Sequence, residues 1–358
     1  MNEKTKMINS LILENINIIS EQPLSTPEQI KKEINIPKRL KEFIFLERKL
    51  ISRIIHKQDK RLLVICGPCS IHEIKGAMEY AERLAFLRRK YSATLNIVMR
   101  SYFEKPRTTV GWKGYINDPH IDGSFDIEYG LRKARILLRS LTELGLPLAT
   151  EALDPISPQY ISEFISWSAI GARTSESQTH REMASGLSMP VGFKNGTDGN
   201  LSSAINGIKA ASHSQIFMGI NQQGRVVLLT TQGNLDGHLI LRGSSQPNYD
   251  EESINQAKIA LQAQNITSGL IVDCSHGNSN KDYRRQPLVA EHVLKQRRDG
   301  NQMIVGIMLE SNLFEGNQNS ETSKEKLKYG VSITDSCMGW ETTEEVMAMC
   351  HEYMSDSP

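Results

Sequence analysis

Four residues with metal-binding side chains follow apolar segments that lie far apart in the chain: Cys69, His276, Glu310 and Asp335. A thiolate, an imidazole and two carboxylates form a mixed donor set, which suits Mn²⁺, Fe²⁺, Co²⁺ or Zn²⁺ better than Mg²⁺ or Ca²⁺. Ligands from distant segments are a weak pattern, so a second interpretation stays open, in which Cys69 and His276 are simply buried. The sequence therefore predicts a candidate site for one divalent metal ion.

Basic residues recur at or just beyond the ends of the same kind of apolar segment: Arg100, Lys105, Arg107, Arg173, Lys194 and Arg242. Arginine presents paired donors that match phosphate and carboxylate groups. So many cations in one place would repel each other unless anions bind among them. The pattern predicts a small ligand with several negative charges, whereas solvated surface charge would explain an isolated Lys or Arg better than six.

Cys66 and Cys69 enclose Gly67-Pro68, which is also a dithiol redox sequence of thioredoxin-like proteins. Cys66 belongs to the apolar segment, and an offset of three residues in extended chain points its side chain away from that of Cys69. A redox function would also leave the other segment ends unexplained. We therefore favour the metal site, with a disulfide under oxidising stress as a possible way to lose one ligand.

These residues need a fold that brings the segment ends together. Eight short apolar segments end at Cys69, Arg100, Glu151, Arg173, Lys194, Arg242, His276 and Glu310, and mostly helical stretches separate them. We expect strands at residues 62–66, 95–99, 148–152, 169–173, 191–194, 239–242, 270–274 and 304–309. Alternating strands and helices predict a parallel sheet, and eight such units fit a closed (β/α)₈ TIM barrel whose strand ends meet at one mouth. Closure would place the eighth strand beside the first.

Two further parts flank or interrupt the predicted barrel, which spans residues 61–358. Residues 1–60 form an N-terminal extension with a capping box at Thr26 and an amphipathic stretch from 40 to 55, whose apolar face needs the barrel or another subunit as its partner. Residues 215–236 carry a turn-rich centre between β-branched flanks, which predicts a β-hairpin inserted before strand six.

The overall composition is that of an ordinary soluble protein. The 358 residues are 39% hydrophobic and 23% charged, with a net charge of +1, so no broad basic field indicates nucleic acid or a membrane surface. The five cysteines suggest no disulfide framework, and the N-terminal residues show no signal-peptide apolar core. We expect a cytoplasmic protein.

Four segments resemble a known family: LVICGPCSIH at 63–72, KPRTTVGWKG at 105–114, GARTSESQ at 171–178 and GFKNGTDG at 192–199. They are similar to the class I alpha branch of 3-deoxy-D-arabino-heptulosonate 7-phosphate (DAHP) synthase. The resemblance runs from about residue 40 to near the end, and the stretches after Gln178 and at 278–283 look closest to the tyrosine-sensitive form. It implies a metal-dependent condensation of phosphoenolpyruvate with erythrose 4-phosphate, the first step of the shikimate pathway.

The resemblance also assigns roles by motif. It implies Cys69, His276, Glu310 and Asp335 as metal ligands, Arg100, Lys105, Arg173, Lys194 and Arg242 as the phosphoenolpyruvate site, and Arg107 and Thr108 as the erythrose 4-phosphate site. Glu151 is expected to orient water or Lys194. Lys105 is expected to give a proton to the new alkoxide, with its acidity raised by neighbouring cations. The expected catalytic set is thus Lys105, Glu151, Lys194, His276 and Asp335.

Feedback inhibition by an aromatic amino acid is a further implication. The matching effector positions are Asp154, Pro158, Ser188, Phe217 and Gly219, and the family's phenylalanine-sensitive members carry serine where this chain has Gly219. The missing side chain would leave room for a phenol hydroxyl, so tyrosine is the expected effector, although Gly219 can also serve only the hairpin. The family forms homodimers or homotetramers, in which the N-terminal arm takes part.

Two other functions compete with this interpretation. One is a Schiff-base aldolase with Lys194 or Lys105 as the nucleophile, in which borohydride would trap an adduct. The other is a regulatory anion-binding protein on a barrel scaffold, which would bind ligand without releasing phosphate.

Overall fold

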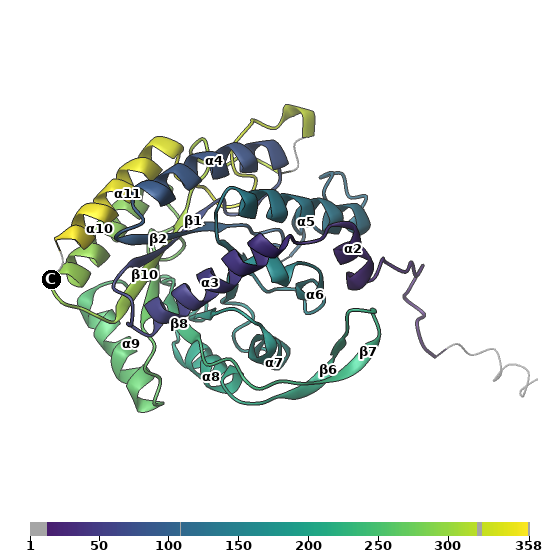
Figure 1. The fold of residues 1–358 in the computed structure, drawn as a ribbon, viewed down its shortest axis with the longest axis horizontal. Coiled ribbons are helices and arrows are strands. Elements are labelled where there is room, and N and C mark those ends of the chain that lie inside the picture. Colours follow the sequence, from purple (N-terminus) through teal and green to yellow (C-terminus); the bar gives the residue numbers. More distant parts are fainter. Residues whose placement is uncertain (1–12, 108, 321–323, 357–358) are drawn as a thin grey trace, which may run out of the picture.

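A closed barrel of eight parallel strands forms the core of the protein (Figure 1). The computed structural model describes residues 13–107, 109–320 and 324–356. The barrel strands are β1 (Leu62–Gly67), β2 (Leu95–Arg100), β3 (Leu148–Glu151), β4 (Ile165–Ile170), β5 (Val191–Lys194), β8 (Gly237–Leu241), β9 (Leu270–Asp273) and β10 (Ile304–Glu310). Because β1 pairs with both β2 and β10, the sheet closes, and the predicted TIM barrel is confirmed.

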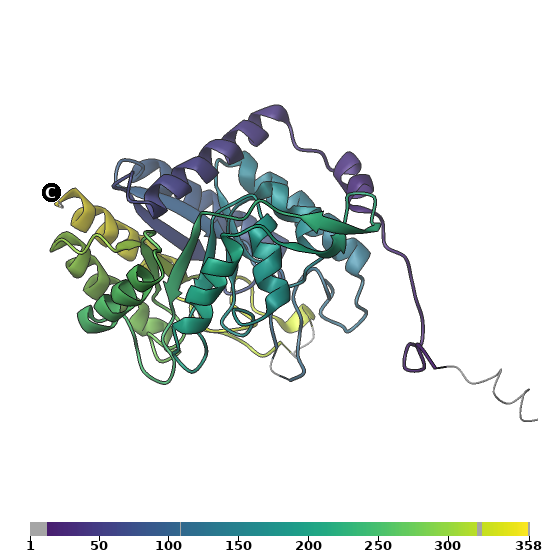
Figure 2. The same ribbon diagram turned by 90° about the horizontal axis from the view of Figure 1, so that it is seen from below.

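Helices between the strands cover the outside of the barrel (Figures 1 and 2). They are α4 (Ile74–Lys90), α5 (Ile127–Glu143), α6 (Pro158–Ile161), α7 (Gln178–Gly186), α8 (Ser202–Ala211), α9 (Glu251–Ala263), α10 (Gln286–Arg298) and α11 (Trp340–Ser355), with short 3₁₀ turns η1 (Ser162–Phe164), η2 (Tyr283–Arg285) and η3 (Lys324–Lys326). Each long helix buries one apolar face; in α5, for example, Leu131, Leu138 and Leu141 pack into the main core. Among the described residues, no helix combines the length and the apolar character needed to cross a bilayer.

The alternation of side chains along the strands creates the site. Val98, Ala149, Ile240, Ile271 and Met308 share one buried cluster inside the barrel. Successive strand residues point to opposite faces, so the residues two positions further on face the same interior, one layer higher. Those positions hold Arg100, Glu151, Arg242, Asp273 and Glu310. The register therefore places a layer of charge directly above an apolar layer, at the carboxyl ends of the strands.

The fourth strand differs from its predicted position. It runs from Ile165 to Ile170 and not over residues 169–173. Ser166 and Ser168 interrupt the apolar pattern, yet both are buried, and the Ser168 hydroxyl donates to the Thr150 carbonyl at 3.3 Å. The chain then turns at Gly171, whose carbonyl accepts from the backbone N–H groups of the third and fourth residues beyond it. Arg173 consequently lies in this turn and not at a strand end.

The N-terminal segment packs on the protein's own barrel. The predicted capping box at Thr26 begins α2 (Pro27–Glu33), and α3 (Lys38–Ile55) follows it. Ile51, Ile54 and Ile55 of α3 join the apolar cluster inside the barrel, so the helix closes the end opposite the charged layer. Each fully buried isoleucine contributes roughly 1.5–3 kcal/mol. The amphipathic stretch therefore packs on the barrel, which was the first of the two partners considered for it.

The inserted β-hairpin is confirmed as β6 (Ile216–Ile220) paired antiparallel with β7 (Val226–Thr230). It extends past α6 and α7 towards α2, where Gln222 accepts a backbone hydrogen bond from Glu28 and a side-chain bond from Lys31, both at 2.8 Å (Figure 1). One face of the hairpin leaves Ile216, Met218, Val226 and Leu228 exposed.

Candidate metal and anion site

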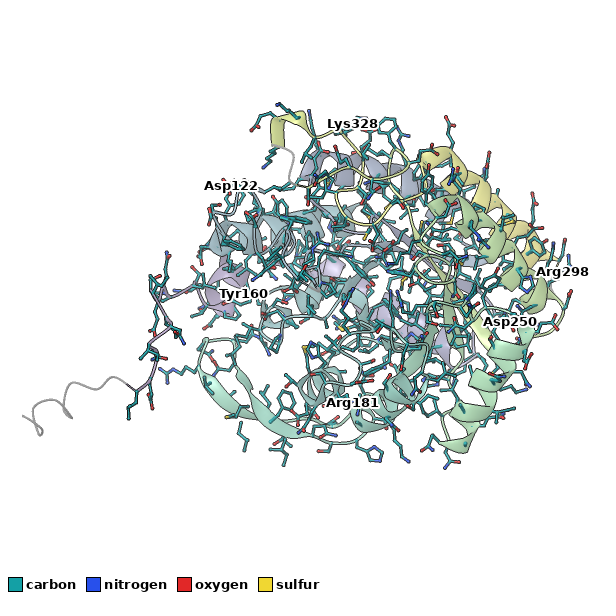
Figure 3. The ribbon with its side chains drawn as sticks, turned by 180° about the vertical axis from the view of Figure 1, so that it is seen from behind. Asp122, Tyr160, Arg181, Asp250, Arg298 and Lys328 are labelled. Carbon is teal, nitrogen blue, oxygen red and sulfur yellow. The ribbon has the colours of Figure 1, made fainter. Side chains whose placement is uncertain are left out.

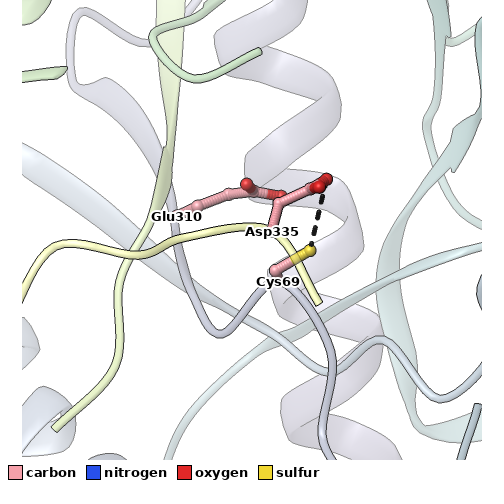
Figure 4. A group of neighbouring side chains, drawn as sticks. All are labelled: Cys69, Glu310 and Asp335. Atoms are coloured by element: carbon pink, nitrogen blue, oxygen red, sulfur yellow. Dashed lines mark hydrogen bonds between the residues drawn. The ribbon is translucent and has the colours of Figure 1, made fainter. Parts of the chain in front are cut away.

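Three of the four predicted metal ligands meet at the mouth of the barrel. Cys69, Glu310 and Asp335 each offer one donor atom, and these atoms all lie within 4.8 Å of one another (Figure 4). Cys69 follows β1 after Gly67, whose φ of +152° and close approach to the Arg100 carbonyl favour a residue without a side chain. Glu310 ends β10. The Cys69 sulfur lies 3.7 Å from Oδ2 of Asp335, which comes from the loop before α11.

His276, the fourth predicted ligand, lies at the edge of this group. Its Nε2 is 3.8 Å from Oε1 of Glu310, but it is not among the three mutually close residues. Its Nδ1 lies 3.0 Å from Oδ2 of Asp273, and its backbone has a φ of +55°. Nδ1 also lies 2.7 Å from the Ser275 hydroxyl, so Ser275 and Asp273 together hold the ring with Nε2 facing Glu310, which is the usual support for a histidine ligand.

The donor chemistry of the group fits a divalent ion. Burial raises the pKa of Cys69 to about 11, with a contribution from Glu310, and neighbouring Lys105 offsets only part of this rise, so the thiol needs a stronger positive charge to ionise. A bound divalent cation favours the thiolate and the carboxylates together. Two carboxylates and a sulfur side by side therefore suit a first-row divalent ion. We call Cys69, Glu310 and Asp335 the cage.

Two of the predicted cations touch this cage directly. Arg100 is fully buried, and its Nη2 donates to Oε1 of Glu310 at 3.1 Å, while its guanidinium lies 4.0 Å from the centre of the Tyr102 ring. Lys105 Nζ lies 3.1 Å from the Cys69 sulfur and 3.3 Å from the Cys69 carbonyl oxygen. Each cation is therefore paired with a candidate metal ligand.

The expectation that neighbouring cations acidify Lys105 is wrong for this arrangement. Burial lowers the pKa of Lys105, but Cys69, Glu310 and Asp335 outweigh burial and raise the pKa above its ordinary value. The immediate surroundings of Lys105 are anionic, since the two buried cations nearest the cage, Arg100 and Lys194, have acidic partners of their own. A divalent cation held by the cage would be the positive charge that offsets these anions.

Lys194 pairs with a residue that the sequence interpretation overlooked. Its Nζ lies 2.8 Å from Oδ2 of Asp273, and both side chains are buried. Oδ1 of Asp273 accepts hydrogen bonds from the backbone N–H and the hydroxyl of Ser275, at 3.0 and 2.5 Å. Burial opposes ionisation of Asp273, but Lys194 and His276 prevail and hold the pKa of this carboxyl well below its usual range. The sequence could have indicated Asp273 as a site residue, because it ends β9 two residues after the inward-facing Ile271.

Of the two roles expected for Glu151, orienting water or orienting Lys194, the second does not match the contacts, since Lys194 pairs with Asp273. Glu151 is buried at the end of β3, and its Oε1 has no hydrogen-bond partner. A β-carbon at Gly171 would stand 2.3 Å from this oxygen, so the glycine allows the close approach. An unpartnered buried carboxylate oxygen is costly, and it is available to a substrate or a water molecule.

The remaining predicted substrate residues lie at the same end of the barrel, further from the cage. Arg173 is exposed, Arg242 is half-buried with Nη1 at 3.3 Å from the Gly243 carbonyl, and Arg107 donates to the Trp112 carbonyl at 2.9 Å. Among the described residues, no hydrogen bond or ion pair joins these three to the cage. Thr108 lies outside the described residues. A cavity of about 220 Å³ opens beside the cage, lined by His276, Glu310 and Asp335 among others.

A larger cavity of about 740 Å³ lies between the hairpin and the segments around α6 and α7. Three predicted effector residues, Pro158, Phe217 and Gly219, line it, whereas Asp154 and Ser188 do not. Both of these are exposed, and Asp154 instead accepts backbone hydrogen bonds from residues 156 and 157.

The expected free space beside Gly219 is absent. A β-carbon at this position would stand 2.5 Å from Cδ1 of Leu229, so that side chain already fills the space. A phenol hydroxyl could enter there only if Leu229 rotated, which a flexible side-chain end permits.

A (β/α)₈ barrel with paired acids and buried cations at the carboxyl ends of its strands has the architecture of barrel enzymes, whose active sites occupy that face. Residues 27–348 match the DAHP synthetase I family. The chain is 58% identical over 340 residues to the Tyr-sensitive phospho-2-dehydro-3-deoxyheptonate aldolase of Escherichia coli K12, covering 95% of this chain and 96% of that protein. It is 46% identical over 347 residues to the phenylalanine-inhibited enzyme of Saccharomyces cerevisiae, covering 95% and 94%.

A solved structure agrees with these relatives. The phospho-2-dehydro-3-deoxyheptonate aldolase of Francisella tularensis SCHU S4 superposes with a TM-score of 0.93 at 44% identity, covering 96% of this chain and 100% of that chain. The chain belongs to the DAHP synthetase I family, and it is an aldolase-type enzyme.

Proposed function

We propose that the protein condenses phosphoenolpyruvate with erythrose 4-phosphate to give 3-deoxy-D-arabino-heptulosonate 7-phosphate and phosphate, the first step of the shikimate pathway. The observation that carries this proposal is the cage of Cys69, Glu310 and Asp335 with Lys105 and Arg100 in direct contact. The relatives' names support the same reaction.

Different cations bind different groups of the two substrates. Arg100, Lys105, Arg173, Lys194 and Arg242 hold the phosphate and carboxylate of phosphoenolpyruvate, and Arg107 with Thr108 holds the phosphate of the sugar. The two phosphates and the carboxylate bring in the negative charge that a mouth rich in Arg and Lys requires. Glu151, with its unpartnered oxygen, holds a water molecule or a substrate hydroxyl.

The reaction then needs one proton delivered to a defined atom. The third carbon of phosphoenolpyruvate bonds to the aldehyde carbon, and the aldehyde oxygen becomes an alkoxide. Lys105 gives its proton to that oxygen, because its Nζ lies beside the cage, where the aldehyde oxygen is proposed to bind. Water adds to the second carbon, which has become positive, and gives one of its protons back to Lys105. Phosphate then leaves with cleavage of its bond to that carbon and takes the remaining hydroxyl proton, so that a ketone is formed.

The cage is proposed to hold one ion of Mn²⁺, Fe²⁺, Co²⁺ or Zn²⁺, with His276 completing the ligands of Cys69, Glu310 and Asp335. When bound, this ion supplies Lewis acidity to the aldehyde oxygen. Asp273 keeps His276 oriented towards Glu310 at the same time as it holds Lys194 in place.

We propose that the 740 Å³ cavity binds an aromatic amino acid as a feedback inhibitor, and that tyrosine is preferred. The cavity has Pro158, Phe217 and Gly219 in its wall, and relatives at 58% identity are named Tyr-sensitive. Asp154 and Ser188 would contact the ligand only at the rim, since they do not line the cavity. The chain is proposed to form a homodimer or homotetramer that covers the apolar hairpin face, and to reside in the cytoplasm, in keeping with its five free cysteines.

One assay tests the proposal. Phosphate release is measured from the two substrates, with and without a chelator, with each divalent ion restored in turn, and in the presence of each aromatic amino acid. We expect activity that the chelator abolishes and a first-row ion restores, and stronger inhibition by tyrosine than by phenylalanine. A borohydride-trapped adduct that forms despite the chelator would support the Schiff-base alternative. Binding without phosphate release would support the regulatory alternative.

A further inference from the structure

The segment 155–159 joins two separate environments. Pro155, Ile156, Pro158 and Gln159 all line the 740 Å³ cavity. Ser157, between them, does not line it; only 6% of this residue is exposed, and its hydroxyl donates to Oε2 of Glu104 at 2.7 Å. One face of the segment therefore forms the cavity wall, and its central side chain points into the protein, towards the loop after β2.

Glu104 immediately precedes Lys105 in that loop. Only 5% of Glu104 is exposed, so its bond to Ser157 is shielded from water. Lys105 in turn places its Nζ 3.1 Å from the sulfur of Cys69. From the cavity wall to the cage the chain of contacts is short: one hydrogen bond, one peptide link and one side-chain contact.

Local hydrogen bonds hold the segment together. Oδ1 of Asp154 accepts from the backbone N–H of Ile156 at 2.7 Å and from that of Ser157 at 3.1 Å, which ties the turn together before α6 begins at Pro158. Further along α6, the Tyr160 hydroxyl donates to the Ser25 carbonyl at 2.9 Å, so this end of the helix is anchored to the N-terminal segment. Figure 3 labels Tyr160 among the side chains of the protein.

The ionisation of Glu104 makes its bond to Ser157 inexpensive to break. Burial raises the pKa of Glu104 to about 8, and the charges of Asp154 and Glu151 add to this effect. Near pH 7 the carboxyl is therefore mostly neutral, and losing the serine donor does not leave a full charge buried without a partner.

We propose that the Ser157–Glu104 hydrogen bond couples the cavity under the hairpin to Lys105, and that Glu104 is a positioning residue for the reaction. A ligand that binds against Pro158 and Ile156 favours one position of the segment. Through the Ser157–Glu104 hydrogen bond, the position of the segment then affects the position of Lys105. This inference rests on the proposed effector cavity and adds the route by which its occupancy reaches the catalytic mouth.

Breaking the bond at Ser157 is the direct test, with tyrosine as the probe and the full-length enzyme throughout. Two quantities are measured for each variant: the Kd of tyrosine by calorimetry, and the activity that remains at saturating tyrosine. For Ser157→Ala we expect the Kd to change by less than about 3-fold, while the fold-inhibition at saturation falls by about 10-fold, because a typical coupling between sites is 5- to 150-fold. Reciprocally, phosphoenolpyruvate should alter the Kd of tyrosine less in this variant than in the wild type.

Two controls separate coupling from simple structural damage. Ser268→Ala removes another buried serine, one that bonds to the Gly237 carbonyl and does not line the cavity, and it should keep the wild-type fold-inhibition. Glu104→Gln keeps an acceptor for Ser157 and should retain coupling, whereas Glu104→Ala should lose it as Ser157→Ala does. If Ser157→Ala is too unstable to assay, the comparison of the two Glu104 variants decides the question.

The outcomes distinguish the two proposals. Unchanged inhibition in Ser157→Ala and Glu104→Ala would overturn the coupling and leave the effector cavity standing. A parallel loss of binding and inhibition would also overturn it, because Ser157 would then belong to the binding site itself. If the wild type binds no tyrosine, the effector proposal is wrong, and the coupling inferred from it falls as well.

Discussion

Replacing Asp273 by asparagine should disable the site while leaving the barrel intact. Asp273 accepts a hydrogen bond from Lys194 at 2.8 Å, its Oδ2 lies 3.0 Å from Nδ1 of His276, and its side chain is completely buried. Asparagine has nearly the same shape but no charge, and its NH₂ group cannot accept a hydrogen bond. The substitution would leave the Lys194 ammonium without its counter-ion in a buried position.

The size of the effect follows from these contacts. Removing one partner of a buried ion pair costs about 3–5 kcal/mol, and we expect about 3 kcal/mol of unfolding free energy because the amide oxygen can still accept one bond. Loss of a carboxylate that orients a histidine ligand typically costs 10- to 100-fold in metal affinity or activity. We therefore expect Asp273→Asn to lower kcat/KM by at least about 100-fold and to release its metal more readily on dialysis.

Three measurements on the same preparation test this reasoning: urea unfolding, metal content after dialysis, and phosphate release against phosphoenolpyruvate concentration. Asp236→Asn is the matched control, since Asp236 also accepts from a serine and a histidine, Ser52 at 2.7 Å and His56 at 2.9 Å, but at the closed end of the barrel. It should lose stability and keep kcat/KM. If Asp273→Asn retained kcat/KM within about 3-fold and its metal content, the assigned role of Asp273 would be wrong.

Three other predictions follow from single residues. Lys105→Met should lower kcat by about 10²- to 10⁴-fold with a much smaller change in the KM for phosphoenolpyruvate; steady-state kinetics would contradict the proton-donor role if turnover stayed near normal. Gly219→Ser should push Leu229 into the cavity and weaken tyrosine inhibition by about 10-fold at unchanged kcat, and an unaltered inhibition curve would show that the two side chains do not clash. Burial lowers the pKa of His238 from its ordinary 6.5 to about 4. Between these pH values the unfolded chain binds a proton that the folded chain does not. The free energy of unfolding should therefore fall by up to about 3 kcal/mol as the pH drops from 6.5 to 4. Replacing His238 by glutamine, which can still accept from Trp167, should flatten that part of the stability profile measured by urea unfolding, and an identical slope would exclude this source.

The fold was predictable because its signals are local. Strand ends carry a polar residue after an inward-facing apolar one, as in Ile271 and Asp273, and helices separate the strands. The fourth strand was misplaced because it contains two polar residues, Ser166 and Ser168, although it is buried. The Ser168 hydroxyl donates to a carbonyl of the neighbouring strand, and only the pairing of the two strands provides this acceptor.

The partners within the site were much less predictable. Residue type and position placed Lys194 at the mouth, but its choice of Asp273 over Glu151 depends on side-chain directions across three strands. Likewise, the sequence shows that Gly219 lacks a side chain, but it does not show that Leu229, on the paired strand, takes up the space. Such pairings arise from tertiary packing and leave no periodicity in the sequence.

The buried cations at the mouth each have a partner close by. Arg100 is matched by Glu310, Lys194 by Asp273 and Lys105 by Cys69, all within about hydrogen-bonding distance. A divalent cation bound to Cys69 and Glu310 would compete with Lys105 and Arg100 for the same atoms, and it would leave those two cations free to receive phosphate and carboxylate. Lys194 would stay neutralised, because Asp273 lies outside the cage. Arg100 and Lys105 thus exchange partners when substrate and metal bind, whereas Lys194 keeps its counter-ion Asp273 while it contacts the substrate. Loss of Asp273 should therefore lower stability and catalysis together.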